Sequence, residues 1–146
     1  MNALIQTKRM GAMGALAAAV ISLAAYSGIA FGGEVKVALS GDQEVPAVKT
    51  SASGAGTITI NDDKSVSGSV TTTGVAGTMA HIHNGAAGKN GPVIIPLTKS
   101  GDSTWSVAAG AKLTDVQFEA FKAGDLYVNV HSAANKGGEI RGQLKP

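Results

Sequence analysis

Apolar and polar residues alternate along much of the chain after residue 33. A repeat of two is typical of β-strands, because successive side chains point to opposite faces of a sheet. The pattern predicts strands over Val35–Leu39, Thr57–Ile60, Val66–Thr73, Val75–His83, Val93–Leu97, Ser103–Val107, Leu126–His131 and Glu139–Leu144. Because proline cannot donate a hydrogen bond to a neighbouring strand, Pro96 predicts that its strand lies at a sheet edge.

One segment has the pattern of a helix instead. Residues 113–122 begin near Thr114, a residue type that caps helix N-termini, and Gly124 follows as a stop signal. We expect the buried side of this helix to be formed by Leu113, Val116, Phe118 and Phe121. About eight short strands with one short helix predict an all-β fold, either a Greek-key β-sandwich or a barrel.

The N-terminal part of the chain differs from the rest in composition. Lys8 and Arg9 precede a stretch from position 10 to position 33 that is uncharged and mostly small or apolar. A basic segment followed by an apolar segment and small residues is typical of a secretory signal peptide. We therefore predict a signal peptide over residues 1–30 and a mature domain over residues 31–146.

Two alternatives concern this leader. Cleavage after Ala30 is favoured, and cleavage after Gly32 is the alternative. An uncleaved anchor is the competing interpretation, because about 20 apolar residues suffice to span a bilayer. The abundance of Ala and Gly gives the segment a weak drive for insertion, which favours cleavage. Export places the mature domain in the periplasm or outside the cell, with no membrane attachment.

The leader also changes the charge balance. The whole chain has 12 Lys and Arg against 10 Asp and Glu, but two of the basic residues precede residue 31 and all of the acidic residues follow it. The mature domain is therefore formally neutral, which argues against nucleic acid as a partner. The chain has no cysteine, which excludes disulfides, thiolate metal sites and a thiol nucleophile.

All three histidines of the chain fall in two of the predicted strands. His81 and His83 are two residues apart, so both side chains point to one face, whereas Ala80 and Ile82 point to the other. His131 lies in a later strand, on the face opposite its apolar residues. If the two strands are neighbours, the three imidazoles converge on one point.

Three converging imidazoles are ligands for a transition metal. Among divalent ions copper binds such nitrogen ligands most tightly, and zinc is the second choice. A site of His81, His83 and His131 leaves a coordination position open. Met79 shares their face, and its thioether favours Cu(I), although methionine more often packs as an apolar residue. The alternative is that the histidines are hydrogen-bonded strand residues without a metal.

Two groups of charged residues are further candidates. Glu139 and Arg141 share a strand face, and we expect an ion pair that fixes strand register. The alternative is that Glu139 orients a histidine or ligates a metal directly. Asp42 and Glu44 lie in a polar loop after the first strand. We expect this loop to be solvated, with cation binding by its acids as the alternative.

Four motifs follow one another along the chain: LSGDQEVP at 39–46, AHIHNG at 80–85, GDLYVNVHS at 124–132 and GGEIRGQL at 137–144. In this order they resemble the CHRD domain, which occurs in the animal protein chordin and in secreted bacterial proteins. The resemblance covers about residues 34–145. It implies an immunoglobulin-like β-sandwich and a location outside the cytoplasm, and it implies no defined activity.

A looser likeness is to Cu/Zn superoxide dismutase, a Greek-key barrel in which a His-x-His strand and a later Val-His bind copper. Carried over, the likeness implies copper ligation by His81, His83 and His131. The histidine that bridges copper and zinc, the cysteine pair and the zinc loop have no counterparts in this chain. The likeness therefore does not extend to dismutase activity.

The sequence leads to three hypotheses of function. The first is an exported metal-binding module, with copper as the first metal and zinc as the second. The next is a non-catalytic structural or adhesive module of the cell envelope that holds no metal. An enzyme is less favoured than either, because no nucleophilic triad, phosphate-binding loop or carboxylate pair is recognisable.

Overall fold

The computed structural model describes residues 32–146, and the predicted signal peptide lies outside the described residues. The elements in chain order are β1 (Gly33–Ser40), the 3₁₀ turn η1 (Gly41–Gln43), β2 (Ser53–Ile60), β3 (Val66–Thr73), β4 (Gly77–Asn84), β5 (Val93–Lys99), β6 (Thr104–Val107), α1 (Asp115–Lys122), β7 (Leu126–Ser132) and β8 (Ile140–Leu144). Among these residues no helix is both long and apolar enough to cross a bilayer.

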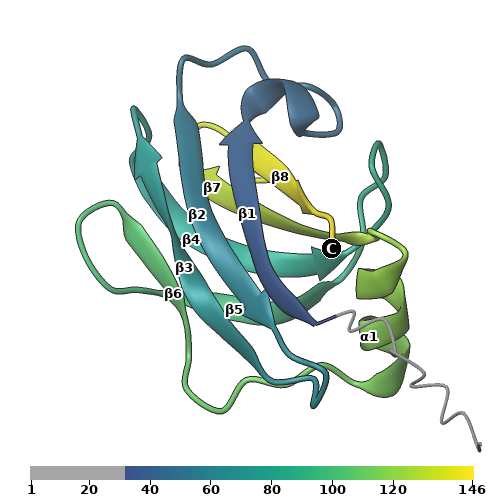
Figure 1. Cartoon of the computed structure of the whole chain (residues 1–146). Coiled ribbons are helices and arrows are strands. Elements are labelled where there is room, and N and C mark those ends of the chain that lie inside the picture. Colours follow the sequence, from purple (N-terminus) through teal and green to yellow (C-terminus); the bar gives the residue numbers. More distant parts are fainter. Residues whose placement is uncertain (1–31) are drawn as a thin grey trace, which may run out of the picture.

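The strands close into one antiparallel barrel (Figure 1). Around the barrel the order is β1–β2–β3–β6–β5–β4–β7–β8, and pairing of Ser40 with Arg141 closes it. β4, β5 and β6 are consecutive neighbours and β7 returns to pair with β4, which is a Greek-key arrangement. The prediction of an all-β fold with about eight strands and one short helix is confirmed. Of the two architectures considered, the structure is the barrel.

The interior of the barrel is a hydrophobic core built by alternation along the strands. In β1, Val35, Val37 and Leu39 are at most 5% exposed, whereas Lys36 and Ala38 between them face solvent. Full burial of one such apolar side chain contributes about 1.5–3 kcal/mol. The alternating residues therefore determine which face of each strand lies inside.

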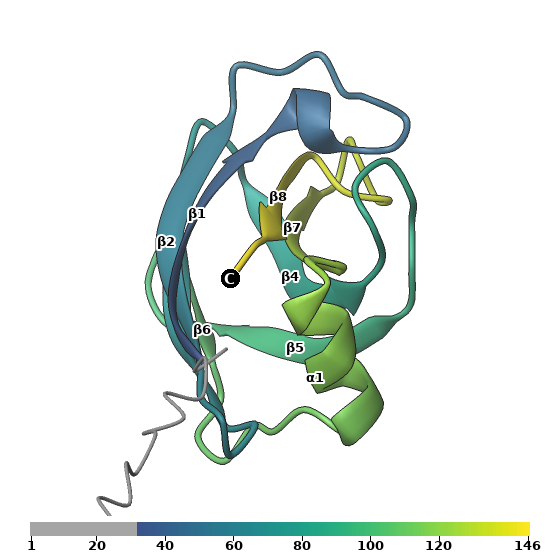
Figure 2. The ribbon, with the colours of Figure 1, turned by 45° about the vertical axis from the view of Figure 1, so that its right-hand side comes forward.

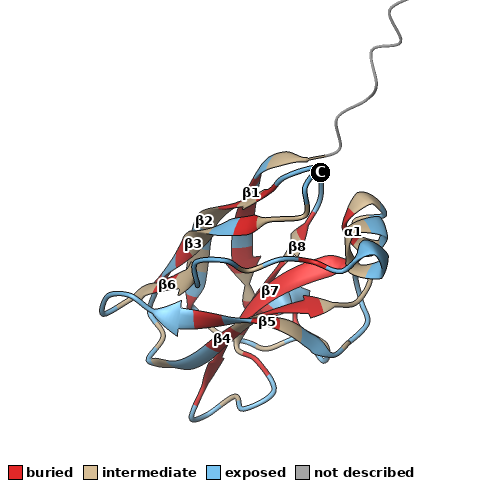
Figure 3. Ribbon diagram, turned by 90° about the horizontal axis from the view of Figure 1, so that it is seen from below, coloured by how far each residue is buried: buried red, intermediate tan, exposed pale blue. Residues whose placement is uncertain are grey.

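β7 departs from this rule because it is buried on both faces (Figure 3). Its inward residues join the core, as alternation predicted. Its outward residues Tyr127, Asn129 and His131 are nevertheless at most 7% exposed. Three loops gather over the outside of the barrel at this flank (Figure 2), formed by residues 41–52, 85–92 and 133–139. A second interior, polar in character, therefore lies between the barrel wall and these loops.

The prediction that β5 lies at a sheet edge is wrong. β5 pairs with β4 on one side and with β6 on the other, because the closed barrel leaves no free edge there. The pairing with β6 begins only at Leu97. Pro96 therefore lies just before the stretch that needs a donor on that side, which reconciles the proline with a central strand.

The helix begins and ends as its caps predict. The side-chain oxygen of Thr114 accepts from the backbone N–H of Gln117, and the Gln117 side chain accepts from the Thr114 N–H, a reciprocal capping box. Gly124 follows the last turn in the left-handed region, with φ of 77°.

The predicted buried side of the helix is only partly right. Leu113 and Phe121 are at most 5% exposed, and Phe118 packs against the core. Val116 is 74% exposed, contrary to the prediction. At about 100° per residue, Val116 lies roughly 140° around the helix from Phe121, so the face that buries Phe121 turns Val116 to solvent.

Candidate metal centre

The histidines come together because β4 and β7 are neighbours in the barrel. The two strands are antiparallel, and their register places His81 opposite Asn129 and His83 opposite Tyr127. His131 lies two residues beyond Asn129 on the same outward face. The expectation that the two histidine strands are neighbours is confirmed.

The three imidazoles form one cluster. The ring centroids are 5.5 Å apart for His81 and His83, 4.9 Å for His81 and His131, and 6.2 Å for His83 and His131. One ligand nitrogen from each ring lies within 4.8 Å of the others. Tetrahedral coordination at about 2.0–2.1 Å places ligand nitrogens roughly 3.3 Å apart. The three rings are therefore close enough together that they could hold one metal ion.

Backbone carbonyls fix the tautomers of two rings. Nδ1 of His83 lies 2.9 Å from the carbonyl of Gly91, and Nδ1 of His131 lies 2.8 Å from the carbonyl of Lys136. A carbonyl only accepts, so each Nδ1 carries the proton and each Nε2 bears a lone pair. Nε2 of His131 lies 3.0 Å from Nδ1 of His81. Nε2 of His83 is buried and has no hydrogen-bond partner.

The surroundings favour the neutral form of His81 and His83. Burial is the largest cause that lowers the pKa of His81, and the neighbouring His131 and His83 lower it further. Burial also lowers the pKa of His83, against the opposing effect of its hydrogen bond to Gly91. A neutral imidazole is the form that ligates a metal. The lowered pKa values therefore favour the ligating form of His81 and His83.

A stack of side chains holds His83 in place. Its ring lies parallel to that of Tyr127, with centroids 4.7 Å apart and an interplanar angle of 4°. The guanidinium of Arg141 lies 3.4 Å from the centroid of the same tyrosine ring. The Tyr127 hydroxyl accepts from the backbone N–H of Gly91, the residue whose carbonyl binds His83. The loop, the tyrosine and the imidazole are therefore positioned together.

Glu44 lies in this polar interior, which corrects the expectation of a solvated loop. Its side chain is buried at 5% exposure, whereas Asp42 two residues earlier is exposed. Burial raises the pKa of Glu44 to about 7, against the lowering effects of Arg141 and of the Asn129 side chain. The carboxyl oxygen Oε1 has no hydrogen-bond partner.

The expected ion pair between Glu139 and Arg141 is not formed. The carboxylate of Glu139 accepts from the hydroxyls of Thr50, at 2.8 Å, and Ser132. These hydroxyls lower the pKa of Glu139. Arg141 instead donates to the carbonyl of Ala86 at 3.0 Å and stacks on an aromatic ring. Glu139 lies in the loop just before β8 and Arg141 lies within β8, and different partners satisfy the two side chains.

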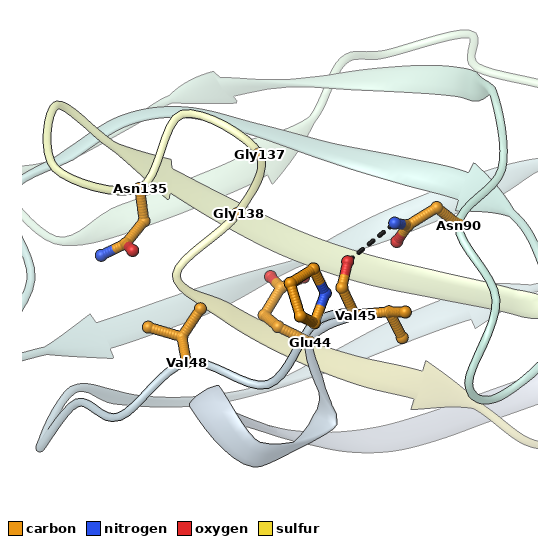
Figure 4. Close-up of a pocket in the computed structure, with 8 residues that line it drawn as sticks. Glu44, Val45, Val48, Asn90, Asn135, Gly137 and Gly138 are labelled. Carbon is orange, nitrogen blue, oxygen red and sulfur yellow. Dashed lines mark hydrogen bonds between the residues drawn. The ribbon is translucent and has the colours of Figure 1, made fainter.

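A cavity of about 390 Å³ opens next to Glu44 (Figure 4). Among the residues that line it are Glu44, Pro46, Val48, Asn90, Asn135 and Gly138. The side-chain amide of Asn90 donates to the carbonyl of Val45 at 2.7 Å, which joins two of the loops across the cavity. The walls come from the three loops that cover β7 and not from the histidine strands.

Sequence reasoning missed part of this arrangement. Alternation places Tyr127 and Asn129 on the same face as His131, but nothing in the pattern indicates that they are buried. Polarity alone predicts a solvent-exposed Glu44. One signal was available, since Glu44, Tyr127 and Asn129 all lie in the four family-like motifs together with the histidines. Met79, considered as a soft ligand, is 50% exposed.

Comparison with known proteins gives one match. The family model described as the CHRD domain matches residues 35–144, nearly the whole described chain. Neither the curated proteins nor the solved structures include a significant match. The resemblance inferred from the four motifs is confirmed by the family match.

Proposed function

The chain belongs to the CHRD domain family, and we propose that it is an exported module that binds a transition metal, copper first and zinc second, through His81, His83 and His131. The observation that carries the proposal is the unpartnered Nε2 of His83. A buried polar atom without a partner costs free energy, which a bound metal recovers.

The hydrogen bonds around the rings support the same proposal. Histidine ligands in proteins usually donate their second nitrogen to a carbonyl or carboxylate, which fixes the tautomer and the ring orientation. His83 and His131 do this through Gly91 and Lys136. These hydrogen bonds therefore support the proposal that both rings ligate a metal.

The donor set guides the choice of metal. Three imidazoles without thiolate or carboxylate suit copper and zinc, and copper has the higher intrinsic affinity. Three protein ligands leave a position for water or a substrate, as in catalytic rather than structural zinc sites. The half-exposed Met79 gives little support for Cu(I).

Export is part of the proposal. It is supported by the basic and apolar leader over residues 1–30 and by the family, whose bacterial members are typically secreted. The mature domain then works in the periplasm or outside the cell. N-terminal sequencing of protein recovered from the native envelope tests it, because an intact Met1 contradicts cleavage.

Metal titration of the exported protein, stripped of metal by dialysis, tests binding. At pH 7.5 we expect one equivalent of Zn(II) to shift the imidazole resonances of all three histidines. Cu(II) should broaden the same signals and displace zinc in competition. Met79→Leu is the control and should bind both metals as the wild type does. Imidazole signals that ignore both metals would contradict the proposal.

The second candidate is a structural or adhesive envelope module without metal. The hydrogen bond between His81 and His131 favours it, because the ring contact joins β4 to β7 by itself. This candidate predicts that His81→Ala loses stability in metal-free buffer and that added metal leaves the melting temperature unchanged. A metal bound only to the native state raises the melting temperature instead.

A further inference from the structure

Glu44 occupies an unusual position for an acid in a loop. Its carboxyl group lies directly against Gly138, where an added Cβ would come within 2.3 Å of Oε1 and 2.6 Å of the Asn129 amide nitrogen. The Glu44 carboxyl group and the Asn129 amide therefore both lie against Gly138. Oε1 is buried, and no described residue donates a hydrogen bond to it.

Asn129 lies between Glu44 and the histidine cluster. Asn129 pairs with His81 in the register of β4 and β7, and it precedes His131 by two residues on the same face. Its amide nitrogen lies beside the Glu44 carboxyl group at Gly138, and this amide favours the ionised form of Glu44. Its own carbonyl oxygen, Oδ1, is buried without a partner, like Nε2 of His83.

The charges that act on Glu44 can be enumerated by element. β8 contributes the positively charged Arg141, β7 contributes the neutral Asn129, and Gly138 of the 133–139 loop lies against the carboxyl group. His83 of β4 lies beyond Asn129. The carboxylate of Glu139 is turned toward hydroxyl groups instead.

The charge balance of this interior changes when a cation enters it. With neutral imidazoles and a protonated Glu44, Arg141 supplies one positive charge at 1% exposure. A divalent cation on the histidines adds two more positive charges. Burying several positive charges together without a negative charge costs free energy. An ionised Glu44, which contacts Asn129, would offset part of this positive charge.

We propose that Glu44 balances the charge of a cation held by His81, His83 and His131, by releasing its proton to solvent when the cation binds. Asn129 couples the two positions. The inference rests on the proposed function, and it deepens that function by making metal uptake proton-coupled. The overall step is one cation taken up and one proton released from the carboxyl group, with no change in oxidation state.

The experiment follows the side-chain carboxyl carbon of Glu44 by NMR in the wild-type protein. Zn(II) is used because it is diamagnetic and leaves the signals visible. In metal-free protein we expect a titration midpoint near pH 7. With one equivalent of Zn(II) the midpoint should fall by about one unit or more, as expected for a carboxyl group near a new positive charge.

Two variants measure the consequence for binding. Glu44→Gln keeps the side-chain shape and should bind Zn(II) about 10-fold more weakly, the lower end of the range for an outer-shell partner. Near pH 7 it should also release fewer protons per metal, measured by calorimetry in two buffers of different ionisation enthalpy. Asp42→Asn removes a carboxyl group from the same loop. It should match the wild type in Zn(II) affinity and in the number of protons released per metal.

The outcomes separate the inference from the function on which it rests. If Zn(II) shifts the imidazole signals but does not change the titration midpoint of Glu44, the inference is overturned and the metal site remains supported. Imidazole signals that do not respond would overturn both. Because the carboxyl titration uses the wild-type chain, a Glu44→Gln variant that failed to fold would not affect this result.

Discussion

Nδ1 of His81 lies 3.0 Å from Nε2 of His131, although fifty residues separate them in the chain. Because Nδ1 of His131 already donates to the carbonyl of Lys136, its Nε2 accepts, and His81 must carry the shared proton on Nδ1. Without metal, the bond occupies the Nε2 lone pair of His131. A metal that binds this lone pair breaks the hydrogen bond, so metal binding and the bond exclude each other.

The first prediction concerns the tautomers in metal-free protein above pH 7. All three rings should carry their proton on Nδ1, because His83 and His131 donate to carbonyls and His81 donates to His131. Long-range nitrogen–proton NMR spectra distinguish the two tautomers directly. An Nε2-protonated His83 would contradict the assigned role of its lone pair.

The second prediction concerns the ligands. His131→Ala removes one nitrogen from the cluster and should abolish the rise in melting temperature that saturating Zn(II) gives the wild type. At 100 times the Kd that rise corresponds to about 2.7 kcal/mol. Met79→Leu changes the residue paired with His131 in the strand register and should retain the full rise. Equal metal-dependent stabilisation of His131→Ala and wild type would refute ligation by this ring.

The sequence predicted the orientation of the histidines better than their surroundings. Alternation at period two determines which side chains share a face, so His81 and His83 were correctly paired and Ile82 was correctly placed in the core. The pairing of β4 with β7, which brings His131 to the other two histidines, could not be predicted in this way. It depends on the Greek-key path of the whole chain, and no local pattern encodes it.

Glu44 shows the same limit. It and Asp42 lie in one polar loop, and local sequence does not distinguish the buried acid from the exposed one. The difference arises because residues 133–139 fold over Glu44 from the far end of the chain. Val116 is the converse case, an apolar residue that the helix turns outward once Phe121 enters the core. Polarity alone therefore misplaces residues whose burial is decided by other segments.

The third prediction is a pH dependence of stability that belongs to Glu44. Its pKa is about 7 in the folded protein, raised by burial from 4.5, which is close to the unfolded value. Between these values the folded state holds more protons, so the carboxyl group lowers stability as pH rises. Relative to wild type, metal-free Glu44→Gln should gain about 1–2 kcal/mol between pH 5 and pH 8, allowing for screening.

Urea unfolding at the two pH values measures this difference. Asp42→Asn, exposed and in the same loop, should differ from wild type by an amount that does not change with pH. If the two variants behaved alike, Glu44 would have an ordinary pKa and the assigned burial would be wrong.

The fourth prediction concerns the histidines, whose effect on the pH dependence of stability is opposite in sign to that of Glu44. Burial lowers the pKa of His81 and His83 below the 6.5 expected of unfolded chains. The unfolded state therefore binds more protons below pH 6.5, and the metal-free protein should lose stability as pH falls from 7.5 to 5.5. The Glu44→Gln background isolates this effect from the carboxyl group. A flat profile there would show that the rings titrate normally.

The last prediction uses two adjacent glycines. Gly138 has φ of 130°, a conformation that side chains disfavour, and a Cβ there would strike Glu44 and Asn129. Backbone strain and overpacking should together cost Gly138→Ala about 2–4 kcal/mol. At Gly137 no atom lies within 4 Å of an added Cβ, so Gly137→Ala should be nearly neutral. Thermal melts of the two metal-free variants test this contrast. Equal stabilities would show that the Glu44 carboxyl group does not lie against Gly138 in solution.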